Sequence, residues 1–235
     1  MRKSMVAAAV AGAAMLLLTT AAPAMAVIDG TTDTTNRFPN VGGLQVRSGG
    51  EWFDFCTGTL VAPDVVLTAA HCTDFFAGAG GPPGGGNSKM SFLKDGNEDI
   101  ALVFLTKDVA NVTPAPVADA GYLDGLDLTS ETFTVAGYGT DKFITGSAAS
   151  PKAITVYDGA RSYRDVSVIT EHDLFPDRFV KITKSVCFGD SGGALFHEGT
   201  LVALNSWTFS LRCAGPNLEY RVDSAPAQSF LDANL

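Results

Sequence analysis

The feature that most constrains the fold is a series of short apolar runs, each bounded by turn-forming residues. The runs are rich in Val, Ile, Leu, Thr and Phe, and clusters of Gly, Pro, Asn and Asp separate them. This pattern is typical of β-strands joined by turns. We expect strands at 41–46, 57–61, 65–70, 100–106, 132–138, 153–156, 166–169, 178–182, 194–196 and 201–207. Helical spacing occurs only in the tail, 225–235, so the sequence predicts an all-β antiparallel barrel or sandwich rather than βαβ units.

The composition is that of a globular chain. Hydrophobic residues make up 46% and charged residues 17% of the sequence, which argues against disorder. The formal net charge is −9, and because an acidic surface repels phosphate we expect no nucleic-acid partner. A glycine-rich stretch at 77–87 lacks the Gly-Lys-Ser/Thr ending of a phosphate-binding loop, so we expect a surface loop there.

The first 26 residues have the layout of a secretory signal. A basic Met-Arg-Lys start is followed by an apolar run over 5–18 and by the small-residue site Ala24-Met25-Ala26. We predict a signal peptide over 1–26 and a secreted, extracellular protein that begins at Val27, without stable membrane association. An uncleaved anchor over 5–26 is the alternative, because this length could just span a bilayer core.

The four cysteines are Cys56, Cys72, Cys187 and Cys213. An even number in an exported chain favours two disulfides, and sequence proximity favours Cys56 with Cys72 and Cys187 with Cys213. A zinc site is the competing interpretation. The chain has no C-x-x-C pair and only three histidines, so we expect neither a metal nor another cofactor.

A serine and a histidine are candidates for acyl-transfer chemistry. In the Gly-Asp-Ser-Gly-Gly stretch at 189–193, a tight turn could expose Ser191 and aim the amides of Gly189 and Ser191 at an oxyanion. Serine needs a nearby base, and His71 follows an apolar run and precedes a cysteine. The other histidines, His172 and His197, stand in polar, turn-like stretches where we expect them to be solvated.

A third candidate is an acid that could orient the histidine. Asp99 stands at the entry to an apolar run, where a partly buried carboxylate needs a partner such as a histidine N–H. Asp95 and Glu98 are equal candidates by composition alone, and an ordinary turn aspartate is the alternative interpretation of Asp99.

Six motifs occur in a fixed order along the chain. They are V-I-D-G from Val27, T-A-A-H-C at 68–72, D-I-A-L at 99–102, G-Y-G at 137–139, G-D-S-G-G at 189–193 and S-W at 206–207. In these motifs, and over 27–235, the chain resembles the chymotrypsin/trypsin-like serine peptidases.

The resemblance implies two antiparallel six-stranded β-barrels, about 27–120 and about 121–235, with a short C-terminal helix. It implies a triad of His71, Asp99 and Ser191 at the junction of the barrels, and it selects Asp99 over its acidic neighbours. It also supports the disulfide pairing favoured by proximity. Having few disulfides, the chain is most similar to a pared-down, bacterial type of member.

The resemblance further implies a switch at the amino terminus. In this family a freed apolar N-terminus pairs with the acid before the nucleophile, which assigns Val27 and Asp190 to these roles. A buried ammonium and a buried carboxylate each carry a high desolvation cost unless they are paired. Signal cleavage would itself expose Val27, so we expect that no further propeptide has to be removed.

Family specificity is set by a pocket whose floor residue is Ser185 here. Serine carries no charge, so we do not expect cleavage after Lys or Arg. Thr208 and Asn217 stand where glycine is common, which favours small or medium neutral residues at the substrate position before the cut, called P1. Ser206, Trp207 and Thr208 should pair with the substrate backbone as an added strand, with Trp207 lining a subsite.

The sequence therefore predicts a monomeric, secreted serine endopeptidase that acts on protein or peptide substrates. A non-catalytic binding module on the same fold is the alternative. Degenerate relatives typically replace the nucleophile or the histidine, and this chain retains both. An α/β esterase is disfavoured because the chain order here is His, Asp, Ser.

Overall fold

The computed structural model describes residues 26–48, 51–73, 91–140, 143–144, 154–155, 159–171, 175–210 and 213–235. Three expectations from the sequence lie outside these ranges. They concern the signal peptide up to residue 25, the glycine-rich stretch at 77–87 and the environment of His172.

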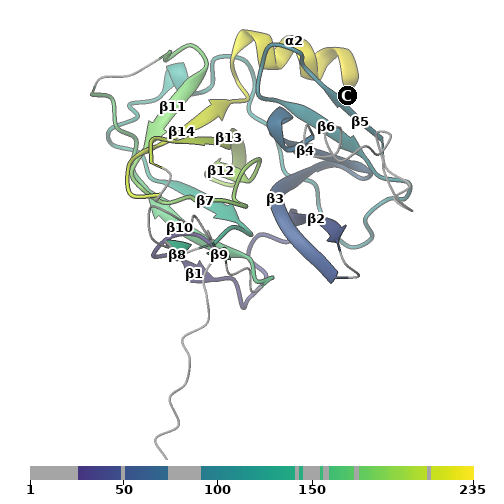
Figure 1. The fold of residues 1–235 in the computed structure, drawn as a ribbon. Helices are drawn as coiled ribbons and strands as arrows, with labels where there is room; N and C mark the ends of the chain where they lie inside the picture. The colour runs from purple at the N-terminus through teal and green to yellow at the C-terminus, as the bar shows by residue number, and fades with distance from the viewer. Residues whose placement is uncertain are drawn as a thin grey trace, which may run out of the picture.

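Two large antiparallel sheets account for nearly all described strands (Figure 1). The five-stranded sheet has the order β2-β3-β4-β6-β5 and consists of β2 (Val41–Ser48), β3 (Glu51–Ala62), β4 (Val65–Thr68), β5 (Ser91–Lys94) and β6 (Ala101–Phe104). The seven-stranded sheet has the order β1-β10-β7-β12-β13-β14-β11. Its strands are β1 (Thr31–Thr32), β7 (Phe133–Gly137), β10 (Ser162–Val166), β11 (Phe179–Ile182), β12 (Ala194–His197), β13 (Thr200–Thr208) and β14 (Asn217–Arg221). A separate hairpin joins β8 (Phe143–Ile144) to β9 (Ile154–Thr155).

The predicted fold class, all-β with a short C-terminal helix, is confirmed. Five of the described strands form the first large sheet, seven form the second, and β8 and β9 form the separate hairpin. Strand β1 pairs with β10 and so adds a piece of the amino-terminal segment to the second sheet. Strands β5 and β14 were not expected from the sequence, and β10 begins four residues before the expected run at 166–169. These strands carry polar residues, so a search for apolar runs does not find them.

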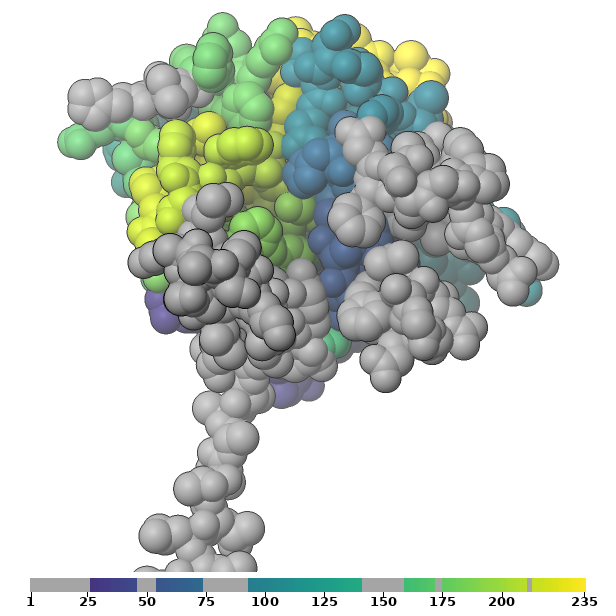
Figure 2. All heavy atoms as spheres, viewed as in Figure 1, coloured from purple at the N-terminus to yellow at the C-terminus, as the bar shows by residue number. Residues whose placement is uncertain are grey.

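One apolar core extends across both sheets. Leu67 and Leu102 of the first sheet and Phe133, Leu195 and Leu204 of the second are fully shielded from solvent within the same cluster. Each such side chain contributes about 1.5–3 kcal/mol when it is buried. The two halves of the chain therefore pack directly against each other, and Figure 2 shows the bluer and the yellow-green atoms meeting along a seam.

The helix α2 (Ala225–Asn234) follows β14 and ends the chain. Ser224 caps its first turn by accepting a hydrogen bond from the backbone N–H of Ala227 at 3.4 Å. Gln228 Nε2 donates to the carbonyl oxygens of Ala118 and Val222 at 3.0 and 2.8 Å. The bond to Ala118 holds the helix against the connector between the sheets, residues 105–132. No helix within the described ranges is long and apolar enough to cross a membrane.

His197 is buried, and the expectation that it is solvated was wrong. It lies at the end of β12 with 4% of its surface exposed. Its Nδ1 lies 2.9 Å from the Tyr122 hydroxyl and its Nε2 lies 3.1 Å from Glu131 Oε2. The turn after β12 does face solvent, but the histidine ring points back against the connector, a contact that local polarity does not reveal.

Candidate active site

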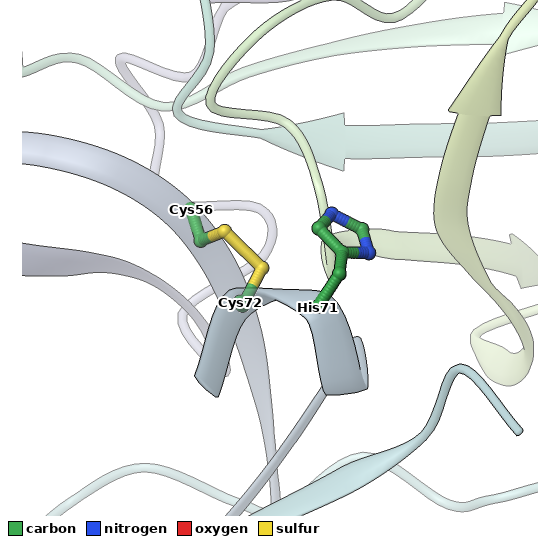
Figure 3. A group of neighbouring side chains, drawn as sticks. All are labelled: Cys56, His71 and Cys72. Atoms are coloured by element: carbon green, nitrogen blue, oxygen red, sulfur yellow. A yellow bond between two sulfur atoms is a disulfide. The ribbon is translucent and has the colours of Figure 1, made fainter. Parts of the chain in front are cut away.

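His71 lies on a short helical turn that directly follows β4. The next residue, Cys72, forms a disulfide with Cys56 of β3, with an S–S distance of 2.03 Å. Figure 3 shows both residues on one turn, with the disulfide reaching back to the strand that carries Cys56. The covalent link holds the turn against the sheet. Because both sulfurs are in the disulfide, neither is available as a thiolate metal ligand beside His71.

Asp99, at the entry to β6, holds the imidazole ring of His71. His71 Nδ1 lies 3.0 Å from Oδ1 and 2.9 Å from Oδ2 of Asp99, and the backbone N–H of His71 donates to Oδ1 at 3.0 Å. The Ser206 hydroxyl donates to Oδ2 at 2.5 Å. This arrangement assigns the ring proton to Nδ1 and leaves Nε2 as the acceptor nitrogen.

The same contacts keep Asp99 ionised. Burial alone would raise the pKa of the Asp99 carboxyl, but the hydrogen bonds and charge of His71, together with the Ser206 hydroxyl, lower it below its ordinary value. The two rival acids have other partners. Asp95 accepts backbone hydrogen bonds within its own turn, and Glu98 contacts Arg178 and the Tyr220 hydroxyl.

The loop that carries Ser191 packs directly against the His71 turn. The carbonyl oxygen of Ser191 accepts a hydrogen bond from Thr57 N at 2.8 Å and lies 3.5 Å from Cys72 Sγ. At Gly192 the φ angle is +75°, and a Cβ there would collide with the Thr68 hydroxyl. Only glycine allows this approach at low cost, so Gly192 lets the loop of Ser191 pack closely against β3 and β4.

The turn at 187–193 also contains two backbone N–H groups that are available as hydrogen-bond donors. Gly189 has a φ of +93°, and its carbonyl oxygen accepts a hydrogen bond from Thr57 Oγ1 at 2.8 Å. Within the described part of the chain, the N–H groups of Gly189 and Ser191 have no hydrogen-bond acceptor. Both donors are therefore free to bind a negatively charged oxygen.

Asp190 is fully buried beneath this turn. Its Oδ1 accepts from Gly139 N and its Oδ2 from Cys187 N, both at 2.9 Å. Burial raises the pKa of Asp190 to about 8 despite these two hydrogen bonds. A Cβ at Gly139 would lie 2.5 Å from the carboxyl, which explains a glycine in the G-Y-G motif.

The segment from Ala26 to Ile28 packs beside the loop that carries Asp190. Val27 is fully buried in the main core. Ile28 N donates to the carbonyl oxygen of Ser185 at 2.8 Å, and Ala26 N donates to the Ser162 hydroxyl at 3.0 Å. The segment therefore contacts the backbone of the loop that leads to Ser191.

The structure brings together the residues expected to form the specificity pocket. Asn217 Oδ1 accepts hydrogen bonds from Ser185 N at 2.9 Å and Val186 N at 3.2 Å, and its Nδ2 donates to Val186 O at 3.2 Å. The Asn217 amide is therefore occupied by backbone partners. Thr208 is half-buried on β13, and the neighbouring Trp207 is 64% exposed.

Glu219, a buried acid on β14, is not among the residues expected from the sequence. Its side chain is fully buried, and neither carboxyl oxygen has a hydrogen-bond partner in the described ranges. The sequence signal was a glutamate between Leu218 and Tyr220, two residues beyond Asn217. This glutamate indicates a buried acid only when the segment is known to be a strand that is buried on both faces.

The two-sheet fold, with the His71–Asp99 pair beside the loop of Ser191, is that of a class of protein, the trypsin-like serine peptidases. The family profile described as "Trypsin" matches residues 27–232, and the chain belongs to this family. The chain is 29% identical over 237 residues to a "Chymotrypsin-like serine proteinase" of Haliotis rufescens, covering 84% of this chain and 88% of the relative.

Other relatives agree with this membership. "Trypsin, alkaline C" of Manduca sexta is 25% identical over 208 residues, covering 77% of this chain and 80% of the relative. Among solved structures, human heparin binding protein aligns with a TM-score of 0.66 at 20% identity, covering 88% of this chain and 95% of that one. At this identity the likeness shows the fold alone.

Proposed function

We propose that this protein is a secreted serine endopeptidase that cleaves protein or peptide substrates through an acyl-enzyme on Ser191. One observation carries the proposal. Both oxygens of Asp99 hold His71 Nδ1, while the loop of Ser191 packs against the turn that carries His71. Family membership supports the same chemistry.

In the proposed reaction, Ser191 Oγ attacks the carbonyl carbon of the scissile bond while His71 Nε2 takes the hydroxyl proton. The N–H groups of Gly189 and Ser191 bind the oxyanion. His71 then gives the proton to the departing amine and leaves an ester on Ser191. A water molecule hydrolyses that ester, with His71 again acting as the base.

Asp99 stabilises the imidazolium that forms in each step. An ionised carboxylate beside Nδ1 favours the positive ring and fixes the tautomer that presents Nε2 to the serine. The low pKa of Asp99 supports this role, because the carboxyl stays charged at neutral pH. Ser206 holds the second carboxyl oxygen and so fixes the orientation of the acid.

We also propose that a free amino group on Val27 completes the oxyanion site by pairing with Asp190. Asp190 is fully buried, and no basic side chain within the described ranges pairs with it. A buried carboxylate without a cation carries a large desolvation cost, which an ammonium group would offset. Ala26 and Val27 are both fully buried, and we therefore propose that the bond between them is cut during export, before the chain folds.

For the substrate, we propose a small or medium neutral side chain at P1, based on the uncharged floor at Ser185 and on the side chains of Thr208 and Asn217. The backbone of 206–208 would add the substrate as a strand, and Trp207 would line a neighbouring subsite. We propose that the mature protein acts as a monomer.

The test uses protein recovered from culture medium and a fluorophosphonate probe, which labels activated serines. We expect amino-terminal sequencing to begin at Val27, and we expect the label on Ser191. The Ser191→Ala variant should be neither labelled nor able to cut casein. Folded, correctly processed protein that resists the probe and leaves casein intact would instead support a binding module on this fold.

A further inference from the structure

Glu219 is a buried acid that the proposed mechanism does not use. Its side chain has no solvent exposure, and both carboxyl oxygens lack a hydrogen-bond partner among the described residues. Leaving a buried polar group unpartnered typically costs about 1–3 kcal/mol. A buried carboxyl without a protein partner is therefore a candidate for binding a partner in another state of the protein.

The position of Glu219 indicates where that partner binds. Residues two apart on a strand point to the same face of the sheet, so Glu219 faces the same side as Asn217, whose amide binds the backbone at 185–186. On β13, Glu219 stands opposite Asn205, next to a bulge whose extra residue is Ser206.

Glu219 therefore lies beside the segments expected to line the P1 pocket. These segments are the stretch from Ser185 to Asp190, the bulge at Ser206 and the start of β14. In the endopeptidase function proposed above, the substrate backbone lies along 206–208, and the side chain of the acyl group on Ser191 would point toward these segments.

The electrostatic environment favours the protonated form of this carboxyl. Burial, followed by the charge of Asp190, raises the pKa of Glu219 well above its ordinary value. The Ser206 N–H faces the carboxyl and favours its charged form, but it is outside hydrogen-bond geometry. A neutral carboxylic acid offers one O–H donor and one carbonyl acceptor on adjacent atoms.

Resting on the endopeptidase function proposed above, we propose that Glu219 is the polar floor of the P1 pocket and selects a medium-length side chain that ends in a carboxamide, as in glutamine. The two groups are complementary. The acid O–H donates to the amide oxygen, and the amide N–H donates to the acid carbonyl.

Other side chains fit this floor less well. An apolar side chain of the same length would leave both carboxyl oxygens without a partner. An anionic side chain would face the neighbouring Asp190. A lysine or arginine would have to ionise Glu219 inside the protein, where the desolvation of both charges opposes the attraction between them.

The experiment compares peptides that differ only at P1, which is glutamine, methionine, lysine or alanine. Methionine matches glutamine in length but lacks the amide. For the mature protein we expect kcat/KM for glutamine to exceed that for methionine by about tenfold or more, because a site built to bind a polar group rejects the analogue that lacks it. We expect lysine to be cleaved no better than methionine.

Two variants test the role of Glu219. Glu219→Met should bring the glutamine-to-methionine ratio close to one while the alanine peptide is still cut. Glu219→Gln, which retains a donor and an acceptor, should keep part of the preference. Glu131→Met, a matched change on the connector, should leave the ratio unchanged.

The outcomes separate the two proposals. Absence of fluorophosphonate labelling at Ser191 would overturn the endopeptidase function and this inference with it. Labelled, active protein that shows no preference for glutamine over methionine, or prefers lysine, would overturn the inference alone. An unchanged ratio in Glu219→Met would do the same. The wild-type profile is decisive even where a variant does not fold.

Discussion

The pairing of Val27 with Asp190 predicts a difference in pH dependence between two forms of the protein. One form starts at Val27, and the other keeps Ala26 and several upstream residues, so that Val27 has no amino group. Both carry Ser191→Ala to prevent self-digestion. In the extended form Asp190 has no cation, and burial raises its pKa from 3.8 to about 8.

The sign of the effect follows from proton binding. Between pH 4 and pH 8 the folded extended form keeps the Asp190 proton, whereas the unfolded chain has released it. Stability therefore falls as the pH rises, by about 1.4 kcal/mol per unit for one proton. From pH 5 to pH 8 the expected loss is roughly 3–4 kcal/mol. In the form that starts at Val27, the ammonium favours the carboxylate, so its loss over the same range should be much smaller.

Urea unfolding, followed by tryptophan fluorescence at several pH values, measures both slopes. Because the charge of Asp190 also acts on Glu219, both forms carry Glu219→Gln as well, so that the difference between their slopes isolates Asp190. Asp190→Asn in the extended form should remove the additional slope. Equal slopes in the two forms, or an extended form unaffected by Asp190→Asn, would refute the pairing.

Three further predictions concern the site and its support. Ser206→Ala should lower kcat by about tenfold or more, since a hydrogen bond to a charged group is worth about 1.5–3 kcal/mol; an unchanged kcat and pH profile would contradict a role in holding Asp99. Gly139→Ala should lower the free energy of unfolding by more than about 2 kcal/mol, because its Cβ would lie 2.5 Å from a buried carboxyl. Urea unfolding measures this free energy, and an unchanged value would contradict the prediction. Replacing Cys56 and Cys72 by alanine should cost about 3 kcal/mol of stability and reduce fluorophosphonate labelling, whereas full labelling would show that the disulfide is not needed to place His71.

Local patterns in the sequence were enough to predict much of this protein. Apolar runs between turn residues located most strands, because strand formation there depends on side chains that are close in sequence. The spacing of the cysteines indicated both disulfides for the same reason, since each closes a short loop of 16 or 26 residues. The ordered motifs around His71, Asp99 and Ser191 indicated the family.

The tertiary structure decided what depends on residues far apart in the chain. Ser206 reaches Asp99 across 107 residues, and Asn217 is bound by backbone groups more than 30 residues away. In the sequence, β14 is a polar stretch. The structure shows that it pairs with β11 on one side and with β13 on the other. Glu219 is buried without a hydrogen-bond partner because of the strands that pack around it, and the local sequence does not show which strands these are.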